Sequence, residues 1–406
     1  MSEVVLIRVS GRDRPGITAA LSNVLGRHNV NVLDIGQAVI HNHLAWGMMV
    51  QLPPEAVNSP VFKELMFTAH ELDLDLRVIP VSPEDYGTWV GEQGQSRMVI
   101  TVLGRQVKAE HIARVSELIT VNKLNIDRIT RLSGRAALNT PEHMRRAAIE
   151  FWVRGRMDDM ALMHATFLNL SHVMDIDIAI QEDNVFRRSR RLVCFDMDST
   201  LIQNEVIDEL ARAAGVGEEV AAITEAAMRG ELDFKASFTR RLALLRGLDA
   251  GVLPEVAASL QVTEGAQRLI ETLRFYRYKI AILSGGFTYF AHYLQKKLGI
   301  DYVYANELEI ENGKLTGRVK GDIVDEHRKA ELLRQIADRE SIRLEQVIAV
   351  GDGANDLPML SAAGLGIAFR AKPAVRKQAR YAMGTSGLDG ILYLIGMREA
   401  DFARVG

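Results

Sequence analysis

The sequence of 406 residues has a single cysteine, Cys194. One thiol excludes an internal disulfide framework and any zinc site built from four cysteines, and it is typical of a reducing cytoplasm. Because Leu192, Val193 and Phe195 around it are apolar, we expect a buried thiol on a strand. The sequence also lacks a plausible cluster of histidine and cysteine, which argues against zinc in general.

Long apolar runs and an excess of one charge are missing too. Nowhere do about 18 apolar residues follow one another, so we expect no membrane span. Residues 1–8 include an acid and end on Arg8 after a short apolar run, and we expect no signal peptide. The net charge of -3 fits neither a basic nucleic-acid-binding protein nor a disordered acidic chain. No Gly-x-x-x-x-Gly-Lys loop occurs, so a phosphate-transferring kinase finds no support.

The N-terminal half contains a repeated pattern of strand and helix signals. Residues 1–85 predict a βαββαβ order, which implies a sheet with both helices on one face. The pattern starts again at Met98, so residues 96–182 predict a second domain of the same kind. Two polar stretches, 83–94 and 181–191, are interpreted as linkers.

In the first repeat, the loop Gly11-Arg12-Asp13-Arg14-Pro15-Gly16 leads from a strand into a helix. Pro15 presets the turn, and Gly16 lets a ligand approach the backbone at the helix N-terminus. The alternative is that this loop binds no ligand and is only a turn that starts a helix. The second repeat has Gln106–Glu110 at this place, without the proline and the glycine, so its ability to bind a ligand alone is open.

Both repeats resemble ACT domains, small βαββαβ modules that bind amino acids and regulate metabolic enzymes. The loop of the first repeat is similar to the ligand-binding loop of that family. The resemblance implies an amino-acid effector, with serine as the leading candidate. The implied effector-binding residues are Gly11, Asp13 and Gly16.

From about residue 190 to residue 400, short apolar strands alternate with turns and longer helical stretches. This pattern predicts an α/β fold with a doubly wound parallel sheet. In such folds the active site lies beyond the carboxyl ends of the strands. Three of the predicted strands, 192–195, 279–283 and 347–350, end in polar motifs, so we expect a site where these ends meet.

Two acids, Asp196 and Asp198, follow the first of these strands. A helix cap or an Asx turn explains one acid there, but not easily both. Two carboxylates can divide the work, because one can hold Mg²⁺ and attack phosphorus while the other transfers a proton. The second strand ends in Ser284-Gly285-Gly286, whose hydroxyl and exposed amides suit phosphate oxygens.

The third strand ends in a glycine-rich loop that contains Asp352, Asn355 and Asp356. The glycines let the loop turn sharply, so both acids can face a metal cleft, and hard carboxylate oxygens suit Mg²⁺. Lys329, on a helical stretch, can extend an ammonium group toward the same phosphate. A lone lysine on a helix is more often simply solvated.

Together these motifs resemble the haloacid dehalogenase superfamily over about residues 192–371, and in detail the phosphoserine phosphatases within it. The resemblance implies that Asp196 is the nucleophile and Asp198 the general acid and base. It also implies that Mg²⁺ is held by Asp196, the backbone carbonyl of Asp198 and Asp352, with support from Asp356. The implied phosphoryl and substrate contacts are Ser284, Gly285, Lys329 and Asn355.

The insertion over about residues 203–262 reads as mainly helical and predicts a cap over the site. The resemblance implies that Glu205 takes the ammonium group of the substrate and that Arg241 takes its carboxylate, because a planar guanidinium binds a carboxylate with two hydrogen bonds. Met228 and Phe234 match apolar residues that close over the substrate. Without the resemblance, Glu205 and Arg241 read as surface charges.

The leading hypothesis is a cytoplasmic Mg²⁺-dependent phosphatase that hydrolyses phosphoserine in the last step of serine biosynthesis. We expect regulation by serine at the ACT domains and a homodimer formed through them, because paired sheets hide their edges. The alternatives are a phosphatase of another small phosphomonoester and an amino-acid-binding regulator with an inactive phosphatase. A dehalogenase is disfavoured, since it needs neither the metal site nor the phosphate site. No nucleic-acid or membrane partner is expected.

Overall fold

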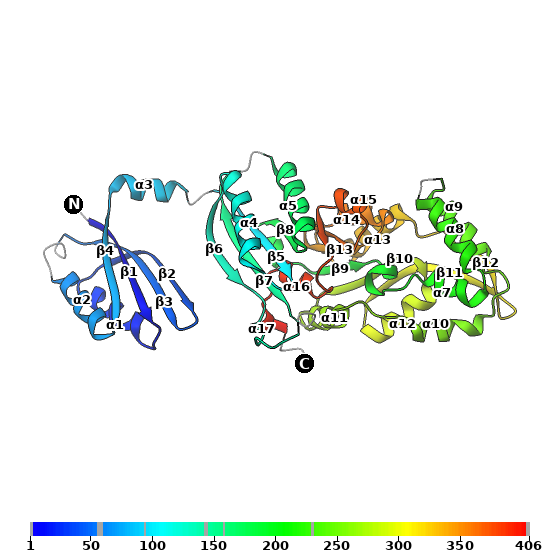
Figure 1. Ribbon diagram of the computed structural model, residues 1–406, viewed down its shortest axis with the longest axis horizontal. Helices are drawn as coiled ribbons and strands as arrows, with labels where there is room; N and C mark the ends of the chain where they lie inside the picture. The colour runs from blue at the N-terminus through cyan, green and yellow to red at the C-terminus, as the bar shows by residue number, and fades with distance from the viewer. Residues whose placement is uncertain are drawn as a thin grey trace. The chain divides into compact units, whose positions relative to one another are not determined.

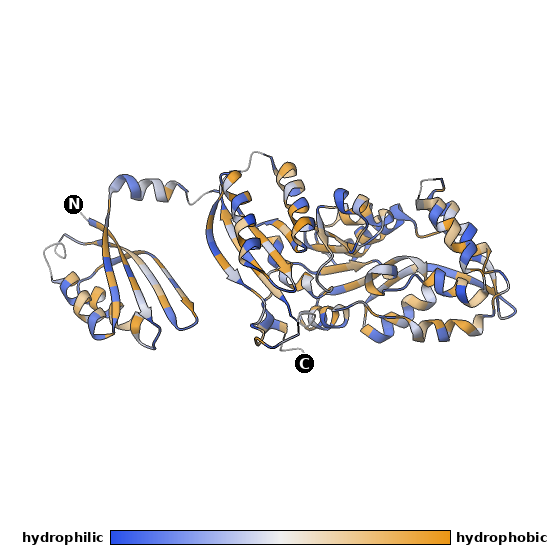
Figure 2. Cartoon of the chain, viewed as in Figure 1, coloured by the Kyte–Doolittle hydropathy of each residue, from blue (hydrophilic) through white to orange (hydrophobic). Residues whose placement is uncertain are grey.

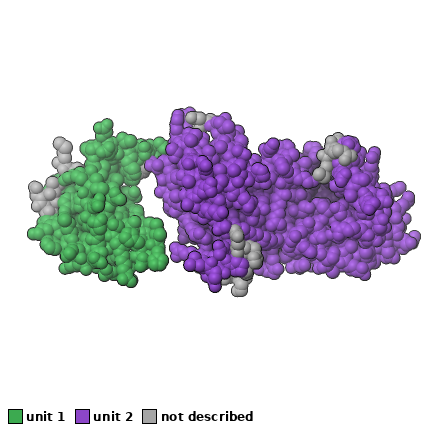
Figure 3. All heavy atoms as spheres, in the orientation of Figure 1, with its two compact units in different colours: residues 1–95 green, residues 96–406 purple. Residues whose placement is uncertain are grey.

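The computed structural model describes residues 3–54, 60–92, 95–141, 145–156, 159–228 and 231–402, without the side chain of Met228. The chain divides into two compact units, residues 1–95 and residues 96–406 (Figures 1 and 3). Among the described residues, no helix is both long enough and apolar enough to cross a membrane.

The first unit contains a four-stranded antiparallel sheet in the order β2-β3-β1-β4. Its elements are β1 (Glu3–Arg12), α1 (Ile17–Arg27), β2 (Asn31–Ile40), β3 (His43–Leu52), α2 (Val61–Glu71) and β4 (Leu74–Val81). Alternate residues of β1, namely Val5, Ile7 and Val9, are buried against the two helices. Figure 2 shows the resulting hydrophilic and hydrophobic bands along these strands. The predicted βαββαβ order is confirmed.

The stretch 83–94, interpreted as a linker, contains helix α3 (Pro83–Gly91). Ser82 caps this helix, because its Oγ accepts a hydrogen bond of 3.0 Å from the Asp85 N–H. Pro83 occupies the first turn, where its fixed φ favours helix. No residue of α3 is buried. The linker is therefore helical over the residues that the structure describes, and Gln93 and Gly94 lie outside them.

The second unit begins with a sheet of the same topology, in the order β6-β7-β5-β8. Its elements are β5 (Arg97–Gly104), α4 (Ala109–Val121), β6 (Asn125–Arg131), β7 (Ala147–Arg154), α5 (Met160–Met174) and β8 (Asp177–Glu182). The strand order matches that of the first sheet position by position, so the predicted repeat of the fold is confirmed. The boundaries of the individual domains stay a prediction.

The same unit contains a seven-stranded sheet in the order β12-β11-β10-β9-β13-β14-β15. The strands are β9 (Leu192–Phe195), β10 (Lys279–Phe287), β11 (Tyr302–Glu311), β12 (Lys314–Lys320), β13 (Val347–Gly351), β14 (Leu365–Phe369) and β15 (Tyr381–Met383). Neighbouring strands are parallel, except that β12 is antiparallel to β11. The predicted doubly wound parallel sheet is confirmed, with one antiparallel edge strand.

Helices cover both faces of this sheet, which explains the uninterrupted apolar strands (Figure 1). Val193 and Phe195 pack on one face with α11 (Ala266–Phe275) and α12 (Thr288–Leu298). Leu192 and Cys194 pack on the other face, with α13 (Glu326–Arg339) and α14 (Leu357–Ala362). The shorter helices are α15 (Pro373–Gln378), α16 (Gly390–Leu394) and α17 (Glu399–Phe402). Cys194 is free and buried, as expected.

The insertion after β9 forms the predicted helical cap. It contains α7 (Val206–Ala214), α8 (Gly217–Met228), α9 (Phe234–Ala243) and α10 (Leu253–Ser259). Its two ends meet where Ile202 pairs with Val262 and the Gln203 N–H donates to the Gln261 carbonyl at 2.8 Å. The hairpin of β11 and β12 also reaches the cap, because the Gly247 N–H donates to the Leu315 carbonyl at 2.8 Å.

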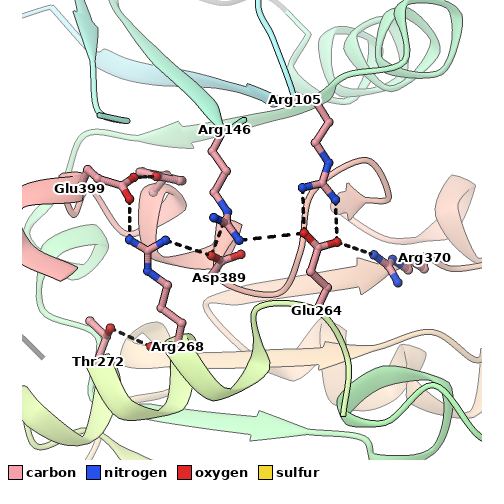
Figure 4. A network of polar contacts seen from close by, with 9 residues as sticks. Arg105, Arg146, Glu264, Arg268, Thr272, Arg370, Asp389 and Glu399 are labelled. Carbon is pink, nitrogen blue, oxygen red and sulfur yellow. Dashed lines mark hydrogen bonds and ion pairs between the residues drawn. The ribbon is translucent and has the colours of Figure 1, made fainter. Parts of the chain in front are cut away.

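Ion pairs join the second repeat to the part of the chain that forms the seven-stranded sheet (Figure 4). Arg105, after β5, binds Glu264 with two hydrogen bonds of 2.7 and 2.6 Å. Arg146, before β7, lies 3.0 Å from the buried carboxylate of Asp389. Asp177 of β8 accepts backbone N–H groups of residues 384–386 at 2.7 to 3.3 Å. These contacts account for residues 96–406 forming one compact unit.

The second predicted linker, 181–191, belongs to this joint. It contains helix α6 (Val185–Arg188), and Arg187 is only 2% exposed. Its guanidinium pairs with the buried carboxylate of Glu150 on β7. Two of the arginines in this run, Arg187 and Arg190, are therefore packed inside the joint, while Arg188 and Arg191 are exposed.

Glu150→Ala leaves the Arg187 charge buried without its partner. We expect a loss of about 3–5 kcal/mol in the free energy of unfolding. Glu117→Ala removes an exposed ion pair with Arg114 on α4 and should cost less than about 1 kcal/mol. Urea unfolding followed by circular dichroism measures both, and equal midpoints for the two variants would contradict this account.

Candidate active site

A cleft of about 220 Å³ lies at the carboxyl ends of β9, β10 and β13. Eight of the predicted residues line it: Asp196, Asp198, Glu205, Phe234, Arg241, Gly285, Asp352 and Asn355. Ser284, Lys329 and Asp356 are completely buried. Met228 ends helix α8, and its side chain lies outside the described part of the chain.

Asp196 directly follows β9 and is 6% exposed. Its Oδ1 accepts hydrogen bonds from the Met197 N–H at 2.7 Å and lies 2.9 Å from Lys329 Nζ. Among the described residues, no donor reaches its second oxygen, Oδ2. Burial raises the pKa of Asp196 well above its ordinary value, and the charge of Asp356 adds to this, while Lys329 opposes it.

Lys329 is the cation beneath the cleft. Its Nζ lies 2.8 Å from Asp356 Oδ1, in addition to its contact with Asp196. Burial lowers the pKa of Lys329, but the two carboxylates outweigh burial and raise the pKa above its ordinary value. Asp325 caps α13 by accepting the Arg328 N–H at 2.9 Å, which sets the start of the helix that carries Lys329. The lysine is thus not a solvated surface residue.

Asp356 has both carboxylate oxygens engaged. Oδ1 meets Lys329, and Oδ2 accepts the Gly353 N–H at 2.9 Å. Asp352 has Oδ1 bound to the hydroxyl of Thr200 at 2.9 Å. Burial, together with the charge of Asp356, raises the pKa of Asp352 to about 7. The carboxylates of Asp196, Asp352 and Asp356 each offer an oxygen within 4.8 Å of the others, which is a spacing that a cation can bridge.

Asp198 is hydrogen-bonded to the cap. It lies in the tight turn Met197–Leu201 with extended backbone angles (φ -66°, ψ 139°). Its Oδ1 accepts a 2.9 Å hydrogen bond from the N–H of Val206, the first residue of α7. Burial raises the pKa of Asp198 well above its ordinary value, and the charge of Glu205 adds to this. The position of this acid therefore depends on the first cap helix.

Close packing explains the glycines of two motifs. A Cβ on Gly286 would lie 2.7 Å from Met197 Cε and still closer to Asp198 Oδ2. A Cβ on Gly351 would lie 2.7 Å from Asp356 Cβ. The Gly286 N–H also donates to Ser284 Oγ at 2.8 Å. Any side chain at these glycines would displace an acid of the site.

The cap side of the cleft carries an acid, a cation and an aromatic pair. Glu205 Oε1 accepts the Ser199 hydroxyl at 2.6 Å. Burial lowers the pKa of Arg241, opposed by the nearby charge of Glu205. The Nε of Arg241 is buried and has no hydrogen-bond acceptor in the described part of the chain. The rings of Phe234 and Phe238 stack with centroids 6.0 Å apart.

The sequence analysis did not predict three residues that line the site or position its side chains. Thr200, which holds Asp352, lies in the first motif and could have been found there. Lys372 lines the cleft just beyond β14, so its position after a parallel strand was a usable signal. Asn306 is buried in β11 and binds the Gly285 carbonyl at 2.8 Å, but no local pattern marks it.

The residues predicted for the effector lie in the first unit. Gly16 has a φ of 94° at the start of α1, and an added Cβ would meet no atom within 4 Å. Its conformation favours glycine, and space is open beside it. The Asp13 N–H donates to the Asn42 carbonyl at 2.8 Å. A Cβ on Gly11 would lie 2.6 Å from Leu74 Cδ2, so packing on β4 alone accounts for that glycine.

The fold and the acidic cleft are those of a haloacid dehalogenase-like hydrolase, and the sequence model of that family matches residues 193–361. The ACT domain model matches residues 3–79. A haloacid dehalogenase-family hydrolase from Salmonella enterica serovar Typhi has a similar structure, with a TM-score of 0.63 and 30% identity over 74% of this chain and 98% of that one.

Two relatives match nearly the whole chain. A phosphoserine phosphatase from Streptomyces coelicolor is 42% identical over 98% of this chain and 93% of its own length. Another from Mycobacterium tuberculosis is 38% identical, over 98% and 94%. The chain belongs to the phosphoserine phosphatase family.

Gly286→Ala should displace Asp198 and lower phosphomonoester hydrolysis by about 100-fold, because small misplacements of reacting groups are costly. Gly384→Ala is the matched control, since its Cβ would meet nothing within 4 Å. We expect it to keep full activity within about twofold. Initial rates of phosphate release and melting temperatures test this, and a fully active Gly286→Ala variant would show that the close approach is unimportant.

Proposed function

We propose that this protein hydrolyses O-phospho-L-serine to L-serine and phosphate through an aspartyl-phosphate on Asp196, as the last step of serine biosynthesis. The observation that carries the proposal is the pairing at the cleft floor. Asp196 and Asp198 line one cleft, and Lys329 holds Asp196 from the buried side at 2.9 Å. This arrangement supplies a nucleophile, a proton donor and a fixed positive charge at one place.

In the first step, a carboxylate oxygen of Asp196 attacks phosphorus, and the bond from phosphorus to the serine oxygen breaks. Asp198 gives its proton to that oxygen, a role that its raised pKa favours. In the second step, water attacks the phosphorus of the aspartyl-phosphate. Asp198 accepts the proton of the water, phosphate leaves, and Asp196 is regenerated.

The phosphoryl group takes its hydrogen bonds from the floor of the cleft. We assign the Lys329 ammonium, the Ser284 hydroxyl and the Gly285 backbone N–H to its oxygens. These donors are fixed before the reaction, which favours the charge on the transferring phosphoryl group. The side-chain amide of Asn306 donates a hydrogen bond to the Gly285 carbonyl and so keeps Gly285 in position.

We propose Mg²⁺ as the cofactor, held by Asp196, the backbone carbonyl of Asp198 and Asp352, with Asp356 as support. The donor set fits, because all ligands are hard oxygens. Since Lys329 and Gly353 engage both oxygens of Asp356, a supporting role suits it better than direct binding. The raised pKa values of Asp196 and Asp352 reflect repulsion and burial that a cation offsets. When bound, Mg²⁺ supplies charge that polarises the phosphoryl group.

The cap side of the cleft selects the substrate in this proposal. Arg241 takes the substrate carboxylate, and its buried, unsatisfied Nε supports that role. Glu205 takes the ammonium group, while Phe234 and Asn355 enclose the remainder. The second candidate function is hydrolysis of another small phosphomonoester, and that function needs neither the charge of Glu205 nor that of Arg241.

Phosphate release from phosphoserine, phosphothreonine, phosphoglycolate and a sugar phosphate tests the substrate. We expect Mg²⁺-dependent activity on phosphoserine. In Arg241→Lys, the KM for phosphoserine should rise by about 10–100-fold, since lysine lacks the planar fork of arginine.

Asp196→Asn should lower kcat by at least about 10⁴-fold. The matched control is Asp338→Asn, which changes an exposed acid of α13 and should leave kcat unchanged. Equal rates on all four substrates would exclude the amino-acid assignment.

We further propose a cytoplasmic homodimer that forms through the ACT domains and responds to serine. The edge strand β2 supports pairing between copies, because four of its apolar side chains are 40–78% exposed: Val32, Ile35, Val39 and Ile40. The match of residues 3–79 to the ACT domain and the open space at Gly16 support an amino-acid effector in the loop 11–16.

Deletion of residues 1–95 tests both proposals, because these residues form a compact unit of their own. Light scattering should give a dimer for the full chain and a monomer for residues 96–406. Serine should change the rate of the full chain but not that of the shortened one. A monomeric full chain would refute the dimer, and a surviving serine response would place the effector outside the first unit.

A further inference from the structure

A groove of about 1010 Å³ lies within residues 96–406, between helices α5 and α15 (Figure 1). One wall comes from the second repeat and the other from the phosphatase part. No described residue lines both this groove and the active-site cleft. The groove is therefore a separate cavity, and the reaction proposed above makes no use of it.

Among the described residues, every titratable side chain that lines the groove is basic. Arg376, Lys377 and Arg380 line it from α15 and the residues just after it, and His164 and His172 line it from α5. Within the described part of the chain, none of the three arginine and lysine groups has a carboxylate within 4.0 Å. Burial lowers the pKa of His164, and the charge of Arg380 lowers it further. The groove itself is therefore positive, and Asp175 lines only the adjoining pocket that shares His172 and Arg376 with it.

The remaining surface of the groove is largely apolar. Leu168 of α5 is half-buried and packs against the hydrophobic cluster on one face of the seven-stranded sheet. Ala165 and Pro373 line the same groove from opposite walls. The His164 ring meets the Tyr381 ring edge-on at 5.8 Å, which holds α5 against β15. An occupant therefore meets apolar surface and cationic groups together.

We propose that this groove binds a small organic anion with an apolar body, of the aromatic or fatty carboxylate or sulfonate type. Arg376 and Arg380 bind the anionic head, and Leu168 and Ala165 contact the apolar body. Charge complementarity favours this occupant over a neutral molecule, because unpaired cations beside apolar surface repel one another until an anion enters.

The anionic fluorophore 8-anilinonaphthalene-1-sulfonate tests the site in the full chain by fluorescence titration. We expect saturable binding at one site and at least about tenfold weaker affinity in the Arg376→Gln/Arg380→Gln variant. The uncharged fluorophore N-phenyl-1-naphthylamine should bind both proteins alike. Arg8→Gln/Arg334→Gln removes two exposed arginines elsewhere and is the matched charge control. Circular dichroism verifies that each variant is folded.

A variant that fills the groove, Ala165→Trp, should weaken binding of both fluorophores. Equal sulfonate affinity in the wild type and in Arg376→Gln/Arg380→Gln would overturn the proposal. Release of the sulfonate by inorganic phosphate would also overturn it, by placing the anion in the active-site cleft. A change in oligomeric mass caused by Ala165→Trp would instead make the groove an interface between copies, and so contradict it.

The groove adjoins the active site along the chain, because Lys372 lines the cleft and Pro373, the next residue, lines the groove. We infer that an occupant changes the position of Lys372. This step rests on the proposed phosphoserine activity, whereas the fluorescence titration does not. At saturating sulfonate, the KM for phosphoserine should change at least about twofold in the wild type and not in Arg376→Gln/Arg380→Gln. An unchanged KM in the wild type would refute the coupling.

Discussion

The site depends on one buried ammonium group. Lys329 Nζ lies 2.9 Å from Asp196 and 2.8 Å from Asp356, with no exposure to solvent. Removing either carboxylate would leave a buried positive charge short of a partner, and removing the lysine would leave acids that repel one another. This contact also joins two strand ends to a helix, because Asp196 follows β9, Asp356 follows β13, and Lys329 comes from α13. The proposed reaction and the packing of the fold therefore depend on the same cluster of ion pairs.

Around this cluster, close contacts with the backbone fix the positions of two of the acids. Gly286 and Gly351 bring backbone close to Asp198 and Asp356, where no Cβ fits. Asp198 also accepts a hydrogen bond from Val206 at the start of the cap. In the proposed mechanism this bond links the position of the cap to proton transfer by Asp198, and a cap that moved to release product would also loosen the acid.

The sequence predicted most of this arrangement, because strand-end motifs in a parallel sheet meet at one edge. Asp196 and Asp352 each follow a buried apolar strand, and Ser284 lies near the end of β10, so their convergence could be expected. Asn306 could not be foreseen, since it reaches Gly285 through packing of β11 beside β10. The burial of Arg187 was missed for a related reason. A run of arginines usually indicates a solvated surface, and only tertiary structure brings Glu150 to it.

The most direct test of the account is a rapid acid quench of the enzyme during turnover of ³²P-phosphoserine, followed by peptide mapping. The account predicts acid-stable, protein-bound label on the peptide that contains Asp196, and no label in Asp196→Asn. Phosphate release without any protein-bound label, or label that persists in Asp196→Asn, would contradict the proposed nucleophile.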